Sequence, residues 1–373
     1  MRVLRIDKRS PYRQLVGVGG LGSGSFFRLE GNDTLGRNES RGGALLDVRD
    51  YCKLHIVSHY VAKLLGAEHG RFSVVPVGRV GDDAAGAFVC REMRAVGIDT
   101  RFVKMVTGKP TLFSVCFQYP DGSGGNITTS NSAAVDLSAQ DIDAIEDLAS
   151  PMGPQTIALL VPEVPLELRE HFLKVARRKN AFCAASFVSG EIDPAKRSRM
   201  FDQLDLVAFN EEEAANFVGE PFSLNTPLSF IEKCVGHVAK AYPHLRLIVS
   251  VGNGGAYAIS REGWNHTPAP PVKVASTAGA GDCLLGGVLA ALAAGIPFSR
   301  KRWSSESEFA LASALDLGAL LASYKVTSPH TIHPTASLDE LTDFARQVGA
   351  SVAPEIEELM AEVTEEETAQ AGL

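Results

Sequence analysis

The chain has 373 residues, of which 45% are hydrophobic and 21% charged, which is typical of a soluble globular protein with a large core. Its net charge of −8 argues against a surface for nucleic acid or for an anionic membrane, since both need a basic face. No apolar run reaches the roughly 18 residues that cross a bilayer, and the first residues lack the apolar segment of a secretory signal. We therefore expect a cytoplasmic protein with reduced cysteines.

The first predicted strand, in residues 14–24, ends in glycines. Gly17, Gly19 and Gly22 formally match the GxGxxG fingerprint of dinucleotide-binding proteins. That fingerprint requires a helix directly after the glycines, whereas the following residues contain further glycines and show no helical period. The sequence therefore argues against a nicotinamide cofactor.

A polar segment at 34–53 leads into an apolar pattern that predicts a helix over 54–66. This segment is a candidate substrate surface, although a solvated polar face explains it equally well. In the predicted helix, His55 and His59 stand four residues apart and would share a face, but no third ligand for zinc is apparent nearby. The candidate substrate contacts are Asn38, Arg41, Lys53, His55 and His59.

A second β element follows at 109–131, where apolar and polar residues alternate around a Pro-Asp-Gly turn at 120–122. This pattern is typical of an exposed β-hairpin. Together with 19–50 it predicts a small β lid or a dimerisation platform.

Beyond Asp141, apolar strands alternate with helices, which predicts a mostly parallel sheet with helices on both faces. The last helices are expected from Asp282 and from about Ser305 to Tyr324. Residues 1–350 should form one α/β domain, with the lid contributed by about 19–50 and 109–131. Residues 351–373 are rich in glutamate and predict an acidic C-terminal helix or tail.

The stretch STAGAGD, at 276–282, places a glycine-rich turn before an apolar helix. Gly279 and Gly281 permit a close backbone approach to a ligand. The amides of Ala278, Gly279, Ala280 and Gly281 would be unpaired at the positive end of the helix dipole, which favours a phosphate group. Asp282 would then act as a general base toward a hydroxyl, although it could also merely cap the helix.

Two further features follow predicted strands, where open α/β sheets bind ligands. Asn210 and Glu213 could hold Mg²⁺ through waters, or could simply cap a helix. Gly252 and Gly255 would let a nucleotide lie against the backbone, or could form a simple β-turn.

In this order, the features resemble the ribokinase, or PfkB, family of carbohydrate and nucleoside kinases. The resemblance implies a ribokinase-like fold, ATP and Mg²⁺. STAGAGD resembles the second signature of that family, NEEEA its NxxE motif, and SVGNGGA its nucleotide loop. The implied roles are base for Asp282, anion hole for Gly279, Ala280 and Gly281, nucleotide binding for Gly252, Gly255, Thr277 and Ala278, and nucleotide and Mg²⁺ binding through water for Asn210 and Glu213.

The sequence also departs from the family pattern. Ser276 stands where the family commonly has Asp, which leaves a monovalent cation site open, and the GGxxxN sugar element is not visible. We expect an ATP-dependent kinase for a hydroxyl of a sugar, nucleoside or related polyol. The alternative is a nucleotide-binding regulatory protein on the same fold. A homodimer also stays open.

Overall fold

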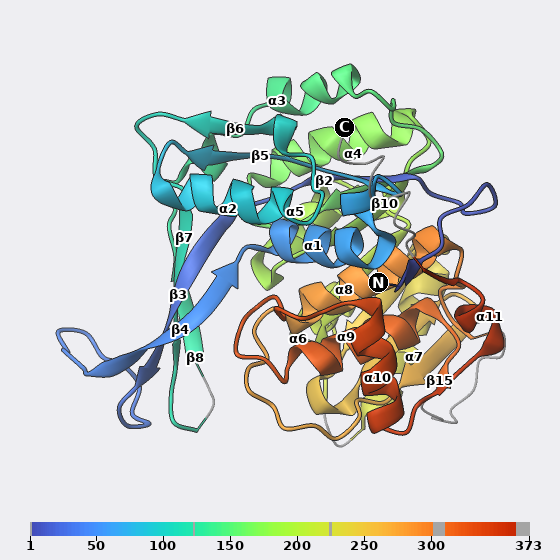
Figure 1. The fold of residues 1–373 in the computed structure, drawn as a ribbon. Helices are drawn as coiled ribbons and strands as arrows, with labels where there is room; N and C mark the ends of the chain where they lie inside the picture. Colours follow the sequence, from blue (N-terminus) through green and yellow to red (C-terminus); the bar gives the residue numbers. More distant parts are fainter. Residues whose placement is uncertain (1, 122–123, 224–225, 301–309, 363–373) are drawn as a thin grey trace.

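The computed structural model describes residues 2–121, 124–223, 226–300 and 310–362. Its centre is a nine-stranded sheet in the order β14-β13-β12-β11-β10-β9-β2-β5-β6 (Figure 1). The strands from β12 to β6 are parallel, and β13 and β14 extend the sheet as antiparallel strands. The strand bounds are β2 Gln14–Val18, β5 Ser73–Gly81, β6 Val103–Val106, β9 Thr156–Leu160, β10 Phe182–Ser186, β11 Leu206–Asn210, β12 Arg246–Ser250, β13 Ala256–Ser260 and β14 Gly263–Thr267.

Helices cover both faces of the sheet, so successive side chains of a strand enter different cores. In β2, Leu15 packs with one cluster, and Val16 packs with the other. The first cluster includes α1 Lys53–Leu65, α2 Ala84–Arg94, α8 Ala280–Ala294, α9 Ala314–Lys325 and α10 Leu338–Gln347. The second includes α3 Ala139–Asp143, α4 Leu166–Arg178, α5 Ile192–Arg197, α6 Glu211–Val218 and α7 Pro227–Ala241. None of the described helices combines the length and apolar character that would let it cross a membrane.

A separate four-stranded sheet projects from one side of the molecule, in the order β4-β3-β7-β8 (Figure 1). It consists of β3 Gly22–Leu29, β4 Gly43–Tyr51, β7 Leu112–Gln118 and β8 Gly124–Thr128. The pair β7 and β8 is antiparallel, as the hairpin pattern predicts. The two segments that predict a lid therefore fold together into one sheet, which we call the lid sheet.

Two predicted helix starts are wrong. Helix α8 begins at Ala280, two residues before Asp282, because the turn at Gly279 already has the left-handed geometry of a cap. Helix α9 begins at Ala314, where Ser313 accepts a hydrogen bond from the amide of Asp316, and not near Ser305. Residues 305–309 of that prediction lie outside the described residues.

The C-terminal segment also differs from the prediction. Its described part is not one solvated helix but consists of β16 Ser351–Val352, α11 Pro354–Glu357 and β17 Met360–Glu362. Strand β17 pairs with β1 Arg2–Leu4, and β16 pairs with β15 Ala310–Leu311. The conformation of this segment is therefore determined by strand pairing with distant residues and not by a helical pattern in its own sequence. The rest of the predicted acidic tail lies outside the described residues.

Candidate active site

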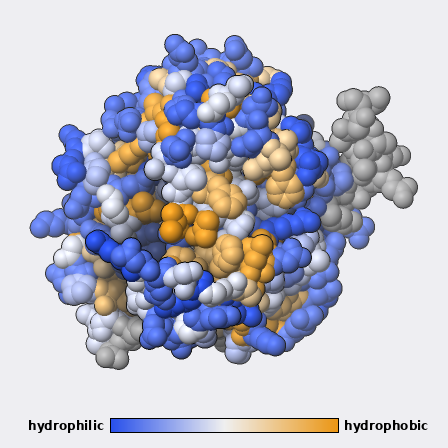
Figure 2. All heavy atoms as spheres, turned by 90° about the vertical axis from the view of Figure 1, so that its left-hand side faces the viewer, coloured by the Kyte–Doolittle hydropathy of each residue, from blue (hydrophilic) through white to orange (hydrophobic). Residues whose placement is uncertain are grey.

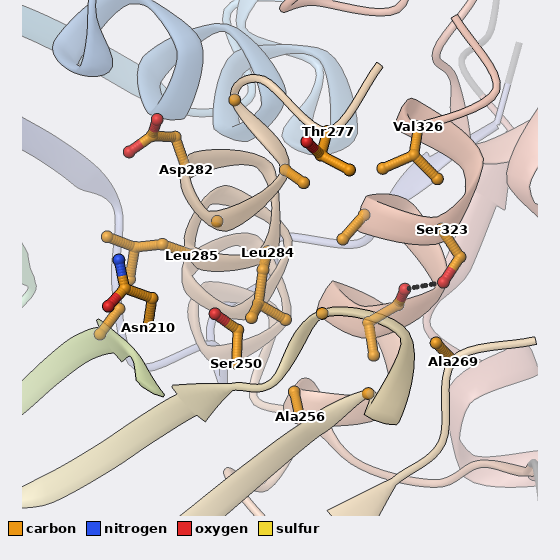
Figure 3. A pocket seen from close by; sticks show the side chains of 18 of the residues that line it. Asn210, Ser250, Ala256, Ala269, Thr277, Asp282, Leu284, Leu285, Ser323 and Val326 are labelled. Atoms are coloured by element: carbon orange, nitrogen blue, oxygen red, sulfur yellow. Dashed lines mark hydrogen bonds between the residues drawn. The ribbon is translucent and has the colours of Figure 1, made fainter. Parts of the chain in front are cut away.

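A cavity of about 800 Å³ lies at the carboxyl ends of β10, β11 and β12, beneath the start of α8. Ligands of open α/β sheets bind at this edge. Asp282, Asn210 and Ser250 all face the cavity, each from a different element (Figure 3). Its volume is in the range of small-molecule binding pockets.

The turn before α8 is partly closed by its own hydrogen bonds. The Ala280 amide donates to the carbonyl oxygen of Thr277 at 3.1 Å, and the Ala278 amide donates to the Ser276 hydroxyl at 3.3 Å. The expectation of four unpaired amides is therefore wrong for Ala278 and Ala280. These two amides are paired because the chain forms a tight hydrogen-bonded turn directly before the helix.

The remaining amides of this turn are free. Within the described residues, the amides of Gly279, Gly281 and Asp282 donate to no protein acceptor. Gly279 has a φ of +75°, which favours glycine, and an added Cβ would approach the carbonyl oxygen of Thr331 to 3.0 Å. Three free donors at the N-terminus of a 15-residue helix suit an anionic group.

Asp282 lies in the first turn of α8, with only 12% of its side chain exposed. The Lys53 ammonium is 3.6 Å from Asp282 Oδ1, so an opposite charge lies beside the predicted base. The charge of Asp282 is the largest cause that raises the pKa of Lys53, and nearby Glu163 and Glu213 add to it. Lys53 therefore stays positively charged at neutral pH.

Glu163 is a site residue that the sequence analysis missed. It lies just beyond β9, and one of its carboxylate oxygens accepts a hydrogen bond from the Lys53 amide at 3.2 Å. Its φ of +77° is uncommon outside glycine, and burial raises its pKa to about 7. A polar side chain just after an apolar strand is the same signal that singled out Asn210, so the sequence does contain a cue for Glu163.

Asn210 and Glu213 form a reciprocal capping box at the start of α6. The Glu213 amide donates to Asn210 Oδ1 at 2.8 Å, and the Asn210 amide donates to Glu213 Oε2 at 2.9 Å. Both residues also line the cavity, and burial raises the pKa of Glu213 to about 7. The structural and the functional interpretation of this motif are therefore compatible.

Gly252 and Gly255 line the cavity in the tight turn between β12 and β13. Gly255 has a φ of +89° and a ψ of −141°, and an added Cβ would meet the carbonyl oxygen of Thr267 at 2.1 Å. Apolar side chains complete this end of the cavity (Figure 3). They include Ala256, Ala269, Val272, Val274, Ala322 and Val326. Such a surface suits the flat face of a base.

The other predicted substrate residues do not line this cavity. His55 and His59 line a second cavity of about 350 Å³, because they lie about 200–240° around α1 from Lys53. Burial lowers the pKa of His59 to about 3, and the pKa of His55 is also lowered, so both rings are neutral at pH 7. Asn38 and Arg41 lie in the exposed loop between β3 and β4, where Arg41 Nε donates to Glu39 at 2.7 Å.

Comparisons with known proteins identify the family and the fold of the chain. The model of the pfkB family of carbohydrate kinases matches residues 57–337. An uncharacterised sugar kinase of Escherichia coli K12, YegV, is 34% identical over 137 residues, a match that spans 37% of this chain and 37% of that relative.

Solved kinases share the fold. The ribokinase of Giardia lamblia matches with a TM-score of 0.71 and 17% identity, covering 91% of this chain and 99% of its own. The ribokinase of Cryptococcus neoformans in complex with ADP matches with a TM-score of 0.69 and 19% identity, covering 89% and 99%. The nucleoside kinase of Burkholderia thailandensis in complex with inosine matches with a TM-score of 0.66 and 15% identity, covering 90% and 99%. The family match extends over most of the chain, and the chain belongs to the pfkB family of carbohydrate kinases.

Proposed function

We propose that this protein is an ATP-dependent kinase that phosphorylates a hydroxyl of a sugar, a nucleoside or a related polyol. One observation carries the proposal: Asp282 faces the same cavity as three free amides at the start of α8 and the glycine turn at Gly255. Donors for a phosphate, a candidate base and a candidate wall for a nucleotide thus line one cavity.

Phosphoryl transfer depends mainly on positioning and on neutralising charge. The amides of Gly279, Gly281 and Asp282 would bind the terminal phosphate of the nucleotide and stabilise charge on the migrating group. The Asp282 carboxylate would accept the proton of the attacking hydroxyl. Lys53 would hold that carboxylate in place and attract the negatively charged phosphate toward it.

The cavity fits a hydrated magnesium ion better than a bare one. No cluster of three or more His, Cys, Asp or Glu side chains within the described ranges could hold a metal alone. Mg²⁺ keeps most of its waters and binds substrate phosphates, so a few oxygen ligands suffice. Glu213 is the residue that would hold it, through water, because only its Oε2 is used by the capping box. When bound, the ion neutralises phosphate charge during transfer.

A buried carboxylate on the lid sheet is evidence for a substrate site between the lid and Asp282. Asp50, on β4, has its pKa raised to about 6 by burial, and Cys116 Sγ on β7 lies 3.7 Å from its carboxylate. A carboxylate on the buried face of the lid can accept hydrogen bonds from substrate hydroxyls. We expect the acceptor to bind between this face and Asp282, with closure of the lid excluding water.

Exposed apolar residues on the opposite face of the lid sheet favour a homodimer. Leu45 and Ile127 are 65% and 69% exposed. Leu45 pairs with Phe27, which pairs with Phe117, while Ile127 pairs with Val115, two residues from Phe117, so all five share one face. Figure 2 looks onto this side of the molecule and shows apolar side chains gathered near its middle.

The replacement of Asp282 by Asn tests the kinase proposal. The variant keeps its volume and loses the proton acceptor, so we expect kcat to fall by about 10²- to 10⁴-fold. ATP affinity, measured by calorimetry, should stay close to the original value. Asp343→Asn, on the exposed face of α10, is the matched control and should retain full turnover. Unchanged turnover of Asp282→Asn, with a sugar or nucleoside that the unmodified protein phosphorylates, would refute the assignment. Nucleotide binding without turnover on any acceptor would favour the regulatory alternative.

A further inference from the structure

Lys325 is a fully buried lysine that has no acidic partner at ion-pair distance in the described part of the chain. It is the last residue of α9, and 0% of its surface is exposed. Its ammonium donates a hydrogen bond to the carbonyl oxygen of Ser276 at 3.0 Å. Burial of an unpaired charge is costly, so a lysine in this place calls for a role other than stability.

The end of α9 is hydrogen-bonded to the segment that leads into the turn at residues 277–281. We call this turn the phosphate turn, after its proposed ligand. The carbonyl oxygen of Val326 accepts hydrogen bonds from the amides of Ala275 and Ser276, at 2.7 and 3.3 Å. Lys325 adds the bond to the Ser276 carbonyl from the same helix end. Figure 3 shows Val326 close to Thr277, the next residue of the turn. The position of the turn is therefore set by the C-terminus of α9.

The same residues do not fit a monovalent cation. The family resemblance implies such an ion beside an acidic residue at position 276, where this chain has serine. The Ser276 carbonyl accepts from Lys325, and its hydroxyl accepts from the Ala278 amide, so an ion at either oxygen would compete with a donor that is already bound there. An ion at this place would also meet the charge of Lys325.

We propose that the Lys325 ammonium replaces the monovalent ion, supplying a fixed positive charge behind the phosphate turn and fixing its backbone through Ser276. Lys325 is a positioning residue, since it acts on the turn and not on substrate. The inference depends on the proposed kinase activity. It implies that turnover is independent of K⁺.

The surroundings of Lys325 make its charge sensitive to pH. The groups that interact with it are Asp50 on β4, Asp282 and Cys283 on α8, and His330 and His333 beyond α9. Burial lowers the pKa of Lys325 to about 8, despite the opposing effect of the acidic groups. Activity that depends on the ammonium should therefore fall as pH rises above about 8.

The sign of the stability effect is opposite to that of activity. The unfolded lysine has the higher pKa, about 10.4, so the unfolded chain binds more protons than the folded chain between about pH 8 and 10. Lys325 therefore contributes a free energy of unfolding that increases over this range, while turnover decreases. A purely structural lysine would not separate the two quantities.

The first experiment compares turnover of the unmodified protein in K⁺, Na⁺ and tetramethylammonium buffers of equal ionic strength. We expect kcat to agree within about twofold across the three, because the charge is built in. A tenfold or greater requirement for K⁺ in an otherwise active enzyme would overturn the inference and leave the kinase proposal intact. A protein with no turnover in any buffer, with any acceptor, would instead contradict the kinase proposal.

The second experiment replaces Lys325 with Met, which has a similar length and no charge. We expect kcat to fall at least tenfold, the decline of activity above pH 8 to disappear, and the rise of unfolding free energy between pH 8 and 10 to disappear. Lys174→Met, on the exposed face of α4, is the control that should change neither profile. Full activity of the Lys325→Met variant without K⁺ would overturn the inference. If this variant fails to fold, Lys325→Gln and the cation comparison still decide it.

Discussion

The Glu213 carboxylate both caps α6 and lines the cavity. Glutamine can make the same capping bond, so Glu213→Gln should change the free energy of unfolding little. We expect the Mg²⁺ concentration for half-maximal activity to rise about 10- to 100-fold, as for other residues that act on a metal through water.

The pKa of Glu213, about 7, predicts how this effect depends on pH. Below pH 7 the carboxylate takes up a proton and no longer attracts the cation, so the apparent Mg²⁺ affinity of the original protein should fall between pH 8 and 6. Glu213→Gln should show no such dependence from this residue. Glu232→Gln, at an exposed position of α7, is the control. Equal Mg²⁺ dependence of all three proteins would remove Glu213 from the metal site.

The sequence identifies some residues of the candidate site and misses others. Asp282, Asn210 and Glu213 were identified because each occupies a fixed place in a motif. Lys325 was not, since a lysine in the last turn of a helix is normally a solvated residue that complements the helix dipole. Only its burial, which depends on the packing of α9 against the rest of the fold, sets it apart. His55 and His59 line a different cavity from Lys53, because closeness in sequence does not imply a common helix face.

The turn between β12 and β13 depends on glycine at position 255. Gly255→Ala would place a Cβ against the Thr267 carbonyl and force a backbone conformation that costs about 1–3 kcal/mol. We expect a lower free energy of unfolding in denaturant and weaker ATP binding, because the turn forms part of the cavity wall.

Gly236→Ala is the matched control, since this glycine lies on the exposed side of α7 with open space for a Cβ. There the alanine should stabilise the protein by about 0.5–1 kcal/mol and leave ATP binding unchanged. Normal ATP affinity in Gly255→Ala would show that the turn is not part of the nucleotide site.

The alternation of strands and helices beyond Asp141 predicted the main sheet, because its strands are buried on both faces and its helices are amphipathic or apolar. Both segments of the lid sheet were predicted as β structure, but the order in which their strands pair was not. The pairing of β17 with β1 was not predictable either, because strands of three residues have no periodicity of their own and are determined by partners elsewhere in the fold.

The assembly of the whole molecule can be tested at the outer face of the lid sheet. If two copies pair there, the double variant Leu45→Lys and Ile127→Lys should be monomeric in light scattering, whereas the unmodified protein should be a dimer, because the new charges would be buried in the interface. Met105→Lys, at an exposed position of β6, is the control and should remain dimeric. A monomeric unmodified protein at micromolar concentration would exclude this interface.

Helices α8 and α9 touch through their backbones. An added Cβ on Gly287 would lie 2.8 Å from the Cα of Gly318, and one on Gly318 would lie 2.6 Å from the Leu284 carbonyl oxygen. Two helices in such close contact cannot slide past each other without breaking their packing, so α8 and α9 should move as one rigid unit. Any hinge motion in the catalytic cycle would then fall to the strands of the lid sheet, whose amides should exchange with deuterium faster than those of the two helices.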